Sequence, residues 1–315
     1  MQHYEDVLFL EPAFIHKLWG GDKLKNEFGY NIINDDKVGE CWGVSAHPHG
    51  KSVVKNGILK GMDLGTLWDK HPEIFGYPKE DRFPLLVKLI DAKQDLSIQV
   101  HPDDEYAKAN EEGSLGKCEC WYVLQCDKNA TIYLGHNAST KEQMQEMIKN
   151  CEWDKFLKEV PIKEGDFIQI EPGTLHSIKK GTVLLEIQQN SDITYRVYDF
   201  DRKINGKARK LHIKQCMDVL NVPSKDPEDF IIHAADLPDN QVNCLYSCRY
   251  YTIYKIEVRD RMTLATDAPY LIMSVITGFG KINGYDVKQG DHMIIPNGVN
   301  ELELEGNFDV ITTRI

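Results

Sequence analysis

The chain has 315 residues, of which 42% are hydrophobic and 27% charged, as expected for a globular protein of one large or two ordinary domains. Its net charge of −12 argues against nucleic acid or an anionic membrane as the main partner, so an anionic substrate needs a local cluster of Lys and Arg. No apolar run is long enough to span a bilayer, and the N-terminus lacks signal-peptide features. We therefore expect a cytoplasmic protein whose eight cysteines are free thiols.

Short β-rich runs bounded by polar or Gly residues predict most of the regular structure. In chain order, the predicted elements are a helix at 64–75, a strand at 85–90, a helix at 103–110, strands at 121–124 and 130–134, a helix at 139–149, a strand at 183–187 and a helix at 211–220. The third helix opens with a capping-box pattern, Ser139-Thr140-Lys141-Glu142. Many short strands with few helices favour a mainly β sandwich or jelly-roll barrel.

A faint internal repeat links two segments of the chain. Residues 163–173 and 288–298 both contain Lys-x-Gly-Asp, four mostly apolar residues, and then a turn with Pro and Gly. This hairpin rhythm predicts two related jelly-roll barrels. In the ungapped alignment His176 falls on Glu301, so a ligand-like histidine occurs in the first copy only. We expect a catalytic domain over 1–235 and a C-terminal β domain without a metal site over 236–315.

The run Ser97-Ile98-Gln99-Val100-His101-Pro102 is the most informative short segment of the chain. Side chains alternate between the two faces of a strand, so Ser97, Gln99 and His101 share one face. That face offers an amide oxygen and an imidazole just before Pro102 ends the strand. An oxygen and an imidazole nitrogen form half of a metal site, whereas a strand-end His that caps a turn is the structural alternative.

Three further polar side chains stand where strands begin or end. Glu119 lies at the start of a predicted strand, His176 leaves a tight turn, and Arg196 follows an unusually polar stretch after a buried strand. Taken singly, each has a structural explanation: a surface charge for Glu119, a turn hydrogen bond for His176, and an ion pair with Asp192 or Asp199 for Arg196. Together the candidate ligands offer two imidazoles, a carboxylate and an amide oxygen, a set that suits zinc with an open position; they are Gln99, His101, Glu119 and His176.

Several linked motifs resemble, in order and spacing, those of the type I mannose-6-phosphate isomerases, most closely the short bacterial form. The motifs are Trp19-Gly20-Gly21, Gly39-Glu40-x-Trp42, Phe83-Pro84-Leu85-Leu86-x-Lys88, Gln99-Val100-His101-Pro102, Lys117-x-Glu119, Gly173-Thr174-x-His176 and Gln189-Asn190-Ser191-Asp192-x-Thr194-Tyr195-Arg196. The resemblance covers essentially the whole chain. It implies a cupin-type fold, a sugar-phosphate substrate, one zinc ion per subunit held by Gln99, His101, Glu119 and His176, and Arg196 as the active-site arginine.

The chain also departs from the family pattern in two places. Longer members carry a His directly before the Lys of the Lys-x-Glu motif, and here that position is Gly116. The large helical insertion of longer members is missing, since His176 follows His101 by only 75 positions. An acid/base role for that His and a lid from that insertion therefore do not carry over.

The expected reaction moves a proton between neighbouring carbons of an open-chain sugar through an enediol, interconverting mannose 6-phosphate and fructose 6-phosphate. We assign catalytic roles to Arg196, which stabilises charge near the reacting carbons, and to Lys117. Ser97 and Lys88 are assigned to the substrate phosphate. For Lys117, a role as base and a role in phosphate binding stay open at this stage.

Two other classes of protein compete with this hypothesis. An iron-dependent cupin oxygenase commonly uses two His and a carboxylate, and His101, Glu119 and His176 provide that subset. The cations Lys88, Lys117 and Arg196 favour a phosphorylated substrate instead. A non-catalytic sugar-binding module is disfavoured, because binding alone does not need a Lewis acid. We expect no nucleic-acid or membrane partner, and either a monomer or a homodimer.

Overall fold

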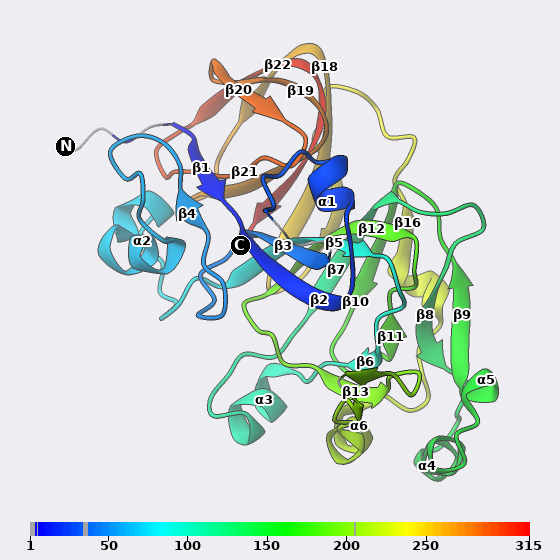
Figure 1. Cartoon of the computed structure of the whole chain (residues 1–315). Coiled ribbons are helices and arrows are strands. Elements are labelled where there is room, and N and C mark those ends of the chain that lie inside the picture. Colours follow the sequence, from blue (N-terminus) through cyan, green and yellow to red (C-terminus); the bar gives the residue numbers. More distant parts are fainter. Residues whose placement is uncertain (1–3, 5, 34–36, 205) are drawn as a thin grey trace. The chain divides into compact units, whose positions relative to one another are not determined.

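The computed structural model describes residues 4, 6–33, 37–204 and 206–315. The chain forms two compact units: the first comprises Met1–Lys17, Asp22–Leu89 and Ala234–Ile315, and the second Leu18–Gly21 and Ile90–His233. Strands β2 (Ala13–Gly21) and β5 (Leu85–Ala92) carry the chain from one unit to the other (Figure 1). The boundary at residue 235 between a catalytic and a C-terminal domain stays a prediction. The compact units follow the chain differently, because most of the first ninety residues belong to the same unit as the C-terminal strands. Within the described ranges, no helix is both long and apolar enough to cross a bilayer.

The first unit is built on one large antiparallel sheet with the strand order β17-β18-β22-β19-β21-β1-β4, and β20 pairs with β19. Its elements are β1 (Leu8–Glu11), α1 (Lys23–Asn26), β3 (Val38–Val44), β4 (Val53–Val54), α2 (Leu64–Lys70), the 3-10 helix η1 (Pro72–Phe75), β17 (Asn243–Ser247), β18 (Thr252–Ala265), β19 (Leu271–Ile282), β20 (Tyr285–Lys288), β21 (His292–Ile295) and β22 (Glu301–Arg314).

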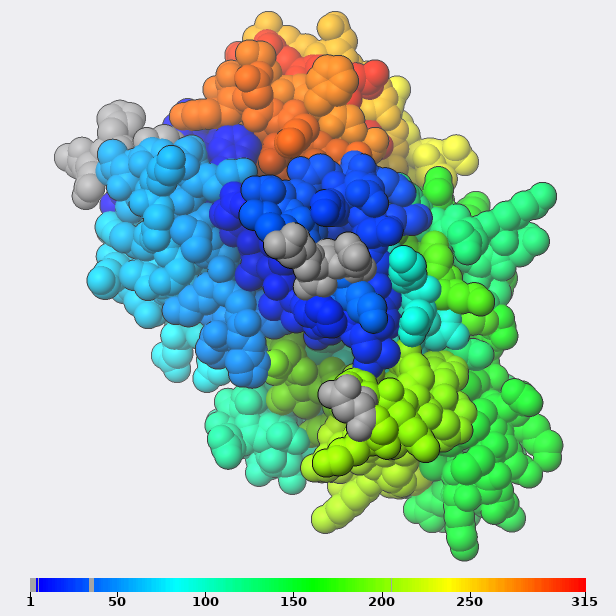
Figure 2. All heavy atoms as spheres, in the orientation of Figure 1, coloured from blue at the N-terminus to red at the C-terminus, as the bar shows by residue number. Residues whose placement is uncertain are grey.

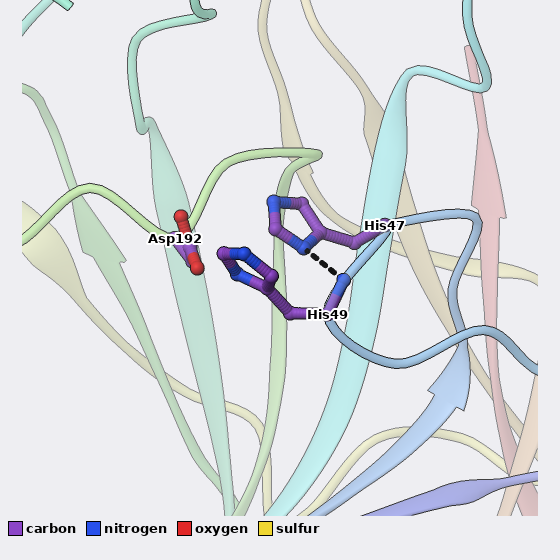
Figure 3. Close-up of side chains that lie close together, drawn as sticks. All are labelled: His47, His49 and Asp192. Atoms are coloured by element: carbon purple, nitrogen blue, oxygen red, sulfur yellow. Dashed lines mark hydrogen bonds between the residues drawn. The ribbon is translucent and has the colours of Figure 1, made fainter.

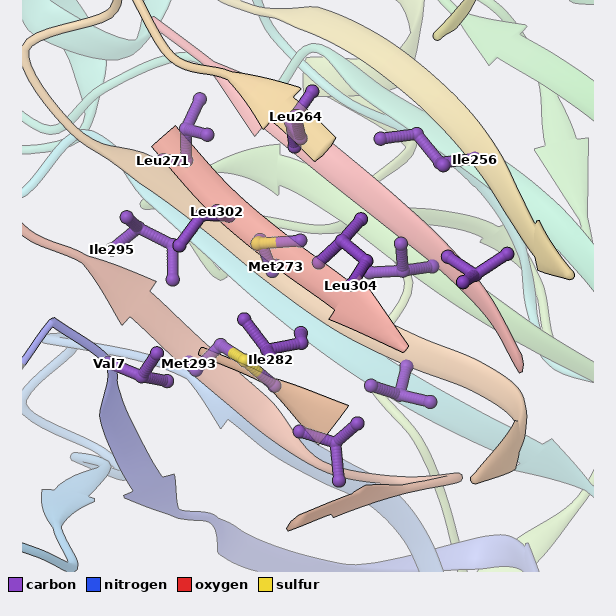
Figure 4. Packing of buried hydrophobic residues seen from close by; sticks show 14 of the residues in the cluster. Val7, Ile256, Leu264, Leu271, Met273, Ile282, Met293, Ile295, Leu302 and Leu304 are labelled. Carbon is purple, nitrogen blue, oxygen red and sulfur yellow. The ribbon is translucent and has the colours of Figure 1, made fainter. Parts of the chain in front are cut away.

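The long strands of this sheet curl around a core of branched aliphatic side chains (Figure 4). Alternation puts Leu302 and Leu304 of β22 on the same face, where they meet Met273 of β19 and Met293 of β21. All four of these side chains are fully buried. Burial of each such side chain contributes roughly 1.5–3 kcal/mol, so this cluster holds the unit together.

The second unit contains two main sheets. One joins β16-β10-β7-β12, together with the ends of β5 and β2, where Ala92 pairs with Gly20; the other has the order β13-β6-β11-β8-β9. The elements are β6 (Ile98–Val100), α3 (Asp104–Asn110), β7 (Glu119–Gln125), β8 (Thr131–His136), α4 (Lys141–Lys149), α5 (Trp153–Phe156), β9 (Leu157–Pro161), β10 (Asp166–Ile170), β11 (His176–Ser177), β12 (Thr182–Gln189), β13 (Tyr195–Tyr198), β14 (Lys203–Ile204), β15 (Lys207–Ala208), α6 (Ile213–Val219), η2 (Pro227–Phe230) and β16 (Ile231–His233).

Two hydrophobic clusters organise the second unit in layers. The first lies between the two sheets, where Trp121 of β7 and Ile168 of β10 pack in one cluster with Leu134 of β8. The second lies on the other side of the five-stranded sheet, where Val100 of β6 packs in one cluster with Met144 and other residues of α4, α5 and α6 (Figure 1). The helices therefore cover the outer face, and the inner face of β13-β6-β11 is available to polar residues.

The mainly β, cupin-type fold is confirmed, with one correction: the sheets are not closed barrels. The predicted strands and three of the four predicted helices are present within a few residues, but the helix predicted at 64–75 divides at His71 into α2 and the 3-10 helix η1, since Pro72 has no backbone N–H to continue the α-helix. The cap of α4 differs, because Thr140 is the N-cap and accepts from the Gln143 backbone, while Gln143 Oε1 accepts from Ser139 N at 2.7 Å. The capping pair thus lies one residue later than the Ser139–Glu142 pattern predicts. All eight cysteines are free thiols.

The two repeated segments adopt the same local turn. In the second unit Lys163 N donates to Asp166 Oδ2 at 2.9 Å, and in the first unit Lys288 N donates to Asp291 Oδ2 at 2.9 Å. The Gly before each Asp has a φ between 84° and 88°, in the left-handed region where only Gly is unstrained. The repeat is therefore structural, and in the second unit it leads through β10 toward His176.

Candidate metal and active site

The side chains of the short strand β6 point alternately to its two faces, as the sequence pattern predicts. Ile98 and Val100 are fully buried in the cluster beneath α4 and α6. On the opposite face, Gln99 Nε2 lies 3.3 Å from His176 Nε2, and Ser97 Oγ lies 3.5 Å from Gln99 Oε1. The register explains this meeting, because His176 of β11 stands directly opposite Gln99 in the antiparallel pair.

His101, Glu119 and His176 form a buried cluster that can hold a metal ion. Glu119 opens β7 in the facing sheet, opposite Gln188 of β12. Its Oε1 lies 3.3 Å from His176 Nε2 and its Oε2 lies 3.5 Å from His101 Nε2. The two imidazole rings are 4.8 Å apart between centroids, and all three side chains are at most 1% exposed. The three residues lie at or next to the ends of β6, β7 and β11, which belong to two different sheets. Their side chains therefore meet between those sheets.

Both imidazoles are anchored to the backbone through Nδ1 and turn Nε2 toward the Glu119 carboxylate. His101 Nδ1 lies 2.8 Å from the Ile193 carbonyl oxygen, and His176 Nδ1 lies 2.9 Å from that of Thr174. A carbonyl only accepts, so each Nδ1 carries the proton and each Nε2 lone pair points toward the Glu119 carboxylate. The Lys117 ammonium donates to Glu119 Oε2, whereas Glu119 Oε1 is buried and makes no hydrogen bond within the described residues. Backbone-anchored imidazoles beside such an oxygen are typical of metal sites. The residues thus fit a divalent metal ion.

Burial also fixes the protonation state that a metal requires. The pKa of His176 is lowered to about 4, chiefly by desolvation and also by the Lys117 charge, while the hydrogen bond with Thr174 and the Glu186 charge act in the opposite direction. His176 is therefore neutral near pH 7, which is the form that binds metals. The indole of Trp121 lies against its ring, with centroids 5.5 Å apart, and holds it in place.

Lys117 reaches into the same cluster. Its Nζ donates to Glu119 Oε2, lies 3.1 Å from His101 Nε2 and lies 3.9 Å from Glu186 Oε1. Lys117 and Glu186 are both at most 5% exposed, so each charge is compensated by the other residues of the cluster. Glu186 was not predicted from the sequence. Glu186 lies two residues before Gln188, which stands opposite Glu119, so Glu186 and Gln188 point to the same face of β12. This two-residue spacing is the sequence signal that could have identified it.

The structure also explains why Gly occupies position 116. A Cβ atom there would lie 2.4 Å from the Asp103 carbonyl carbon and 2.5 Å from the Asp104 nitrogen. These are backbone atoms at the start of α3, so they cannot move aside for a side chain. The Gly116 amide donates to Asp104 Oδ1 at 2.9 Å, which pins the loop. A histidine at this position is sterically excluded.

Arg196 lies beside the cluster because of strand register. It stands directly opposite Gln99 in the β13–β6 pair, so the two side chains share a face. Partial burial lowers the pKa of Arg196 and the Asp199 charge opposes this, but an arginine stays protonated in a protein. Its Nε is buried and makes no hydrogen bond within the described residues. The guanidinium therefore has donor capacity left for a ligand.

Lys88, His47 and His49 belong to the first unit, whereas the His101-Glu119-His176 cluster belongs to the second. Lys88 is 5% exposed, and its Nζ lies 5.4 Å from the centroid of the Trp42 ring. His47 and His49 are neighbours, since His49 N donates to His47 Nδ1 at 3.3 Å (Figure 3). The role of Lys88 in phosphate binding stays a prediction.

A mainly β protein of cupin type with a buried His-Glu-His set beside an arginine defines a class of candidate metal-dependent enzymes. The model of the type I phosphomannose isomerase catalytic domain matches residues 7–150, and that of the mannose-6-phosphate isomerase cupin domain matches residues 241–315. The mannose-6-phosphate isomerase ManA of Bacillus subtilis is 47% identical over 98% of this chain and 99% of its own. That of Streptococcus mutans is 44% identical over 98% of both. The chain belongs to the type I phosphomannose isomerase family of enzymes.

Solved structures agree with this assignment. The crystal structure of the mannose 6-phosphate isomerase from Bacillus subtilis matches with a TM-score of 0.91 and 41% identity, over 99% of this chain and all of the other. A more distant protein from Archaeoglobus fulgidus has a TM-score of 0.78 at 20% identity over 100% of this chain and 99% of its own, and shares the fold.

Proposed function

We propose that this isomerase interconverts D-mannose 6-phosphate and D-fructose 6-phosphate through an enediol, with one zinc ion per subunit. The observation that carries the proposal is the convergence of two imidazoles on one buried carboxylate, with an arginine in register beside them. The family membership supplies the reaction class. Because the chain has a net charge of −12, the cations Lys117 and Arg196 at this cluster support an anionic substrate by supplying local positive charge.

The proposed metal ligands are His101, Glu119 and His176, with the Gln99 amide oxygen as the fourth. Two imidazoles and a carboxylate suit zinc, and Gln99 lies within 3.3 Å of His176. Rotation of the Gln99 amide by half a turn exchanges its nitrogen for its oxygen, which supplies the fourth donor without moving the backbone. When bound, the zinc ion would act as a Lewis acid on the oxygens of the two reacting carbons.

Arg196 is proposed to stabilise the negative charge that develops on the sugar oxygens. Its guanidinium is permanently charged, half-buried and next to Gln99, so its field is weakly screened. Lys117 is proposed to hold or move a proton at its Nζ, because Glu119 and Glu186 orient that atom within the cluster. Ser97, at 3% exposed and on the Gln99 face, and Lys88 are proposed to bind the substrate phosphate.

A coupled assay with the zinc-loaded protein tests the proposal in both directions. We expect turnover of mannose 6-phosphate and of fructose 6-phosphate, loss of activity on chelation, and recovery when zinc is restored. The absence of turnover with either sugar phosphate on fully loaded protein contradicts the proposal. An oxygen electrode tests the two-His, one-carboxylate alternative, and we expect no oxygen consumption with the iron-loaded protein.

A further inference from the structure

The segment that follows β13 returns to that strand at His212. After Tyr198 the chain forms the exposed hairpin of β14 and β15 and then leads into α6. Yellow-green atoms of this part of the chain lie on the face shown in Figure 2, and α6 lies beside β13 and contacts it (Figure 1). His212 is the N-cap residue of α6, but its side chain makes no capping hydrogen bond. The imidazole therefore serves another partner.

That partner is the backbone of Arg196. Arg196 N donates to His212 Nδ1 at 3.1 Å, and His212 N donates to the Arg196 carbonyl oxygen at 2.8 Å. Strand β13 is at the edge of the five-stranded sheet, and the N–H and C=O of a strand residue point to the same side of the strand. His212 thus takes the place of a neighbouring strand at this residue, with its imidazole as the acceptor.

This bonding affects how Arg196 faces Gln99. Because the N–H and C=O of Arg196 are turned to His212, its pairing with Gln99 is of the non-hydrogen-bonded kind, in which opposed side chains lie closer. The register of β13 and β6 shifts directly afterwards, between Arg196 and Tyr198, and such a bulge disrupts the ladder and re-aims side chains. Arg196 Nε makes no hydrogen bond within the described residues. His212 therefore supports the arginine where the strand pairing is irregular.

The contact requires a neutral imidazole. A backbone N–H only donates, so Nδ1 of His212 must carry the lone pair, and the proton of the neutral ring is on Nε2. The ring is partly buried, and its pKa is lowered by desolvation and by the charges of Arg196 and Lys210, although the Glu111 charge opposes them. Near pH 7 the ring is therefore neutral and can accept.

We propose that His212 is a positioning residue, which holds the backbone of Arg196 so that the guanidinium faces the candidate metal cluster. His212 acts through Arg196, so the inference rests on the proposed role of that arginine in the isomerase reaction. Without the Nδ1 acceptor, the Arg196 N–H loses its partner, and the edge strand must shift or admit water. A displacement of about 1 Å in a group that acts on the reacting atoms costs up to about 100-fold in rate.

Two amide variants separate the acceptor from the bulk of the side chain. His212→Asn can place its amide oxygen where Nδ1 lies, whereas His212→Gln places its own near Nε2, away from the Arg196 N–H. With mannose 6-phosphate and zinc-loaded protein, we expect kcat to fall about 10- to 100-fold in His212→Gln and to stay within about 2-fold of the wild type in His212→Asn. Metal content should be equal in all three proteins. Equal losses of kcat in both variants contradict the inference.

A double-mutant cycle shows whether the effect passes through Arg196. Addition of His212→Gln to Arg196→Ala is expected to cause no further loss of kcat, since the group that His212 positions is already absent. An additive loss overturns the inference and leaves the proposed role of Arg196 intact. Normal turnover in Arg196→Ala would instead contradict the proposed role of the arginine, and the inference with it.

Hydrogen exchange measures the positioning without any turnover. The Arg196 amide is expected to exchange about 10-fold faster in His212→Gln than in the wild type, while His212→Asn retains the protection. His233→Gln, a change of a histidine that is 59% exposed in the same unit, is the matched control and leaves this amide protected. Unchanged protection in His212→Gln overturns the inference. If the wild type isomerises neither sugar phosphate but the exchange pattern is as expected, the proposed function fails and the support of Arg196 by His212 stands.

Discussion

Arg196 stands directly opposite Gln99 in the antiparallel pair of β13 and β6. Opposed residues of antiparallel strands point to the same face. The arginine therefore lies beside a candidate metal ligand, although the two residues are far apart in the sequence. Gln99 in turn stands opposite His176 of β11. One row across three strands thus joins the arginine to two candidate ligands, and it does so with backbone hydrogen bonds that a side-chain substitution leaves intact.

The metal ligands can be tested by removing one imidazole at a time. His101→Ala and His176→Ala are each expected to lose at least nine-tenths of the bound metal, because Glu119 then faces a single imidazole. Metal analysis after gel filtration measures this. His71→Ala in the first unit is the control and should keep the wild-type content. Full occupancy in either of the first two variants would remove that histidine from the ligand set.

Arg196 is expected to matter for turnover and not for metal binding. Arg196→Ala should retain the metal and lose about 10²- to 10³-fold in kcat, the usual loss when a charge-stabilising donor is removed. Arg196→Lys keeps the positive charge but not the planar fork, and we expect only partial recovery. The check is kcat together with metal content for each variant. Near-normal turnover in the alanine variant argues against the assignment.

A variant of Lys117 distinguishes a role in proton transfer from a role in metal binding. Lys117→Met keeps the length of the side chain and removes its charge, so contacts of Nζ with Glu119 and His101 disappear. Turnover is expected to fall about 10²- to 10⁴-fold, as for loss of a proton-transfer group. Metal affinity should be equal or higher, since Glu119 no longer pairs with an ammonium. A loss of metal in this variant would instead indicate that Lys117 only supports the ligands.

Stability should depend on pH through a buried histidine of the first unit. His292 is 1% exposed, its Nδ1 lies 2.8 Å from Ser274 Oγ, and burial lowers its pKa to about 4. The unfolded chain binds the proton near pH 6.5, so this contribution is complete above 6.5 and is lost as the pH falls to 4. The full loss is about 3 kcal/mol. Urea unfolding from pH 7 to 4 should show a shallower decline in His292→Gln than in the wild type, and parallel curves would refute the assignment.

The same histidine explains why position 43 is glycine. A Cβ on Gly43 would lie 2.3 Å from His292 Cδ2, and the ring is held by Ser274 and by Tyr30 Oη at 3.3 Å. Gly43→Ala is therefore expected to destabilise the protein by about 1–3 kcal/mol through overpacking. An unchanged unfolding midpoint in Gly43→Ala would mean that the ring moves aside.

Local sequence determined those features that depend on a few neighbouring residues. Alternation in Ser97–His101 assigned Gln99 and His101 to one face, and that face is the one that meets His176. The Lys-x-Gly-Asp repeat gave the same turn twice, because a short carboxylate and a left-handed Gly act within four residues. Family motifs then joined the separate segments to one reaction class.

Only the tertiary structure decided which remote side chains meet. Glu186 joins Lys117 because β12 pairs with β7, and Arg209 reaches Asp199 because a hairpin returns the chain to a tight turn. Neither contact follows from spacing, since pairing partners and register depend on packing of the whole unit. The steric exclusion of a side chain at Gly116 is of the same kind. The sequence by itself therefore identified the candidate ligands and the fold class, and the folded chain decided how charge is distributed around them.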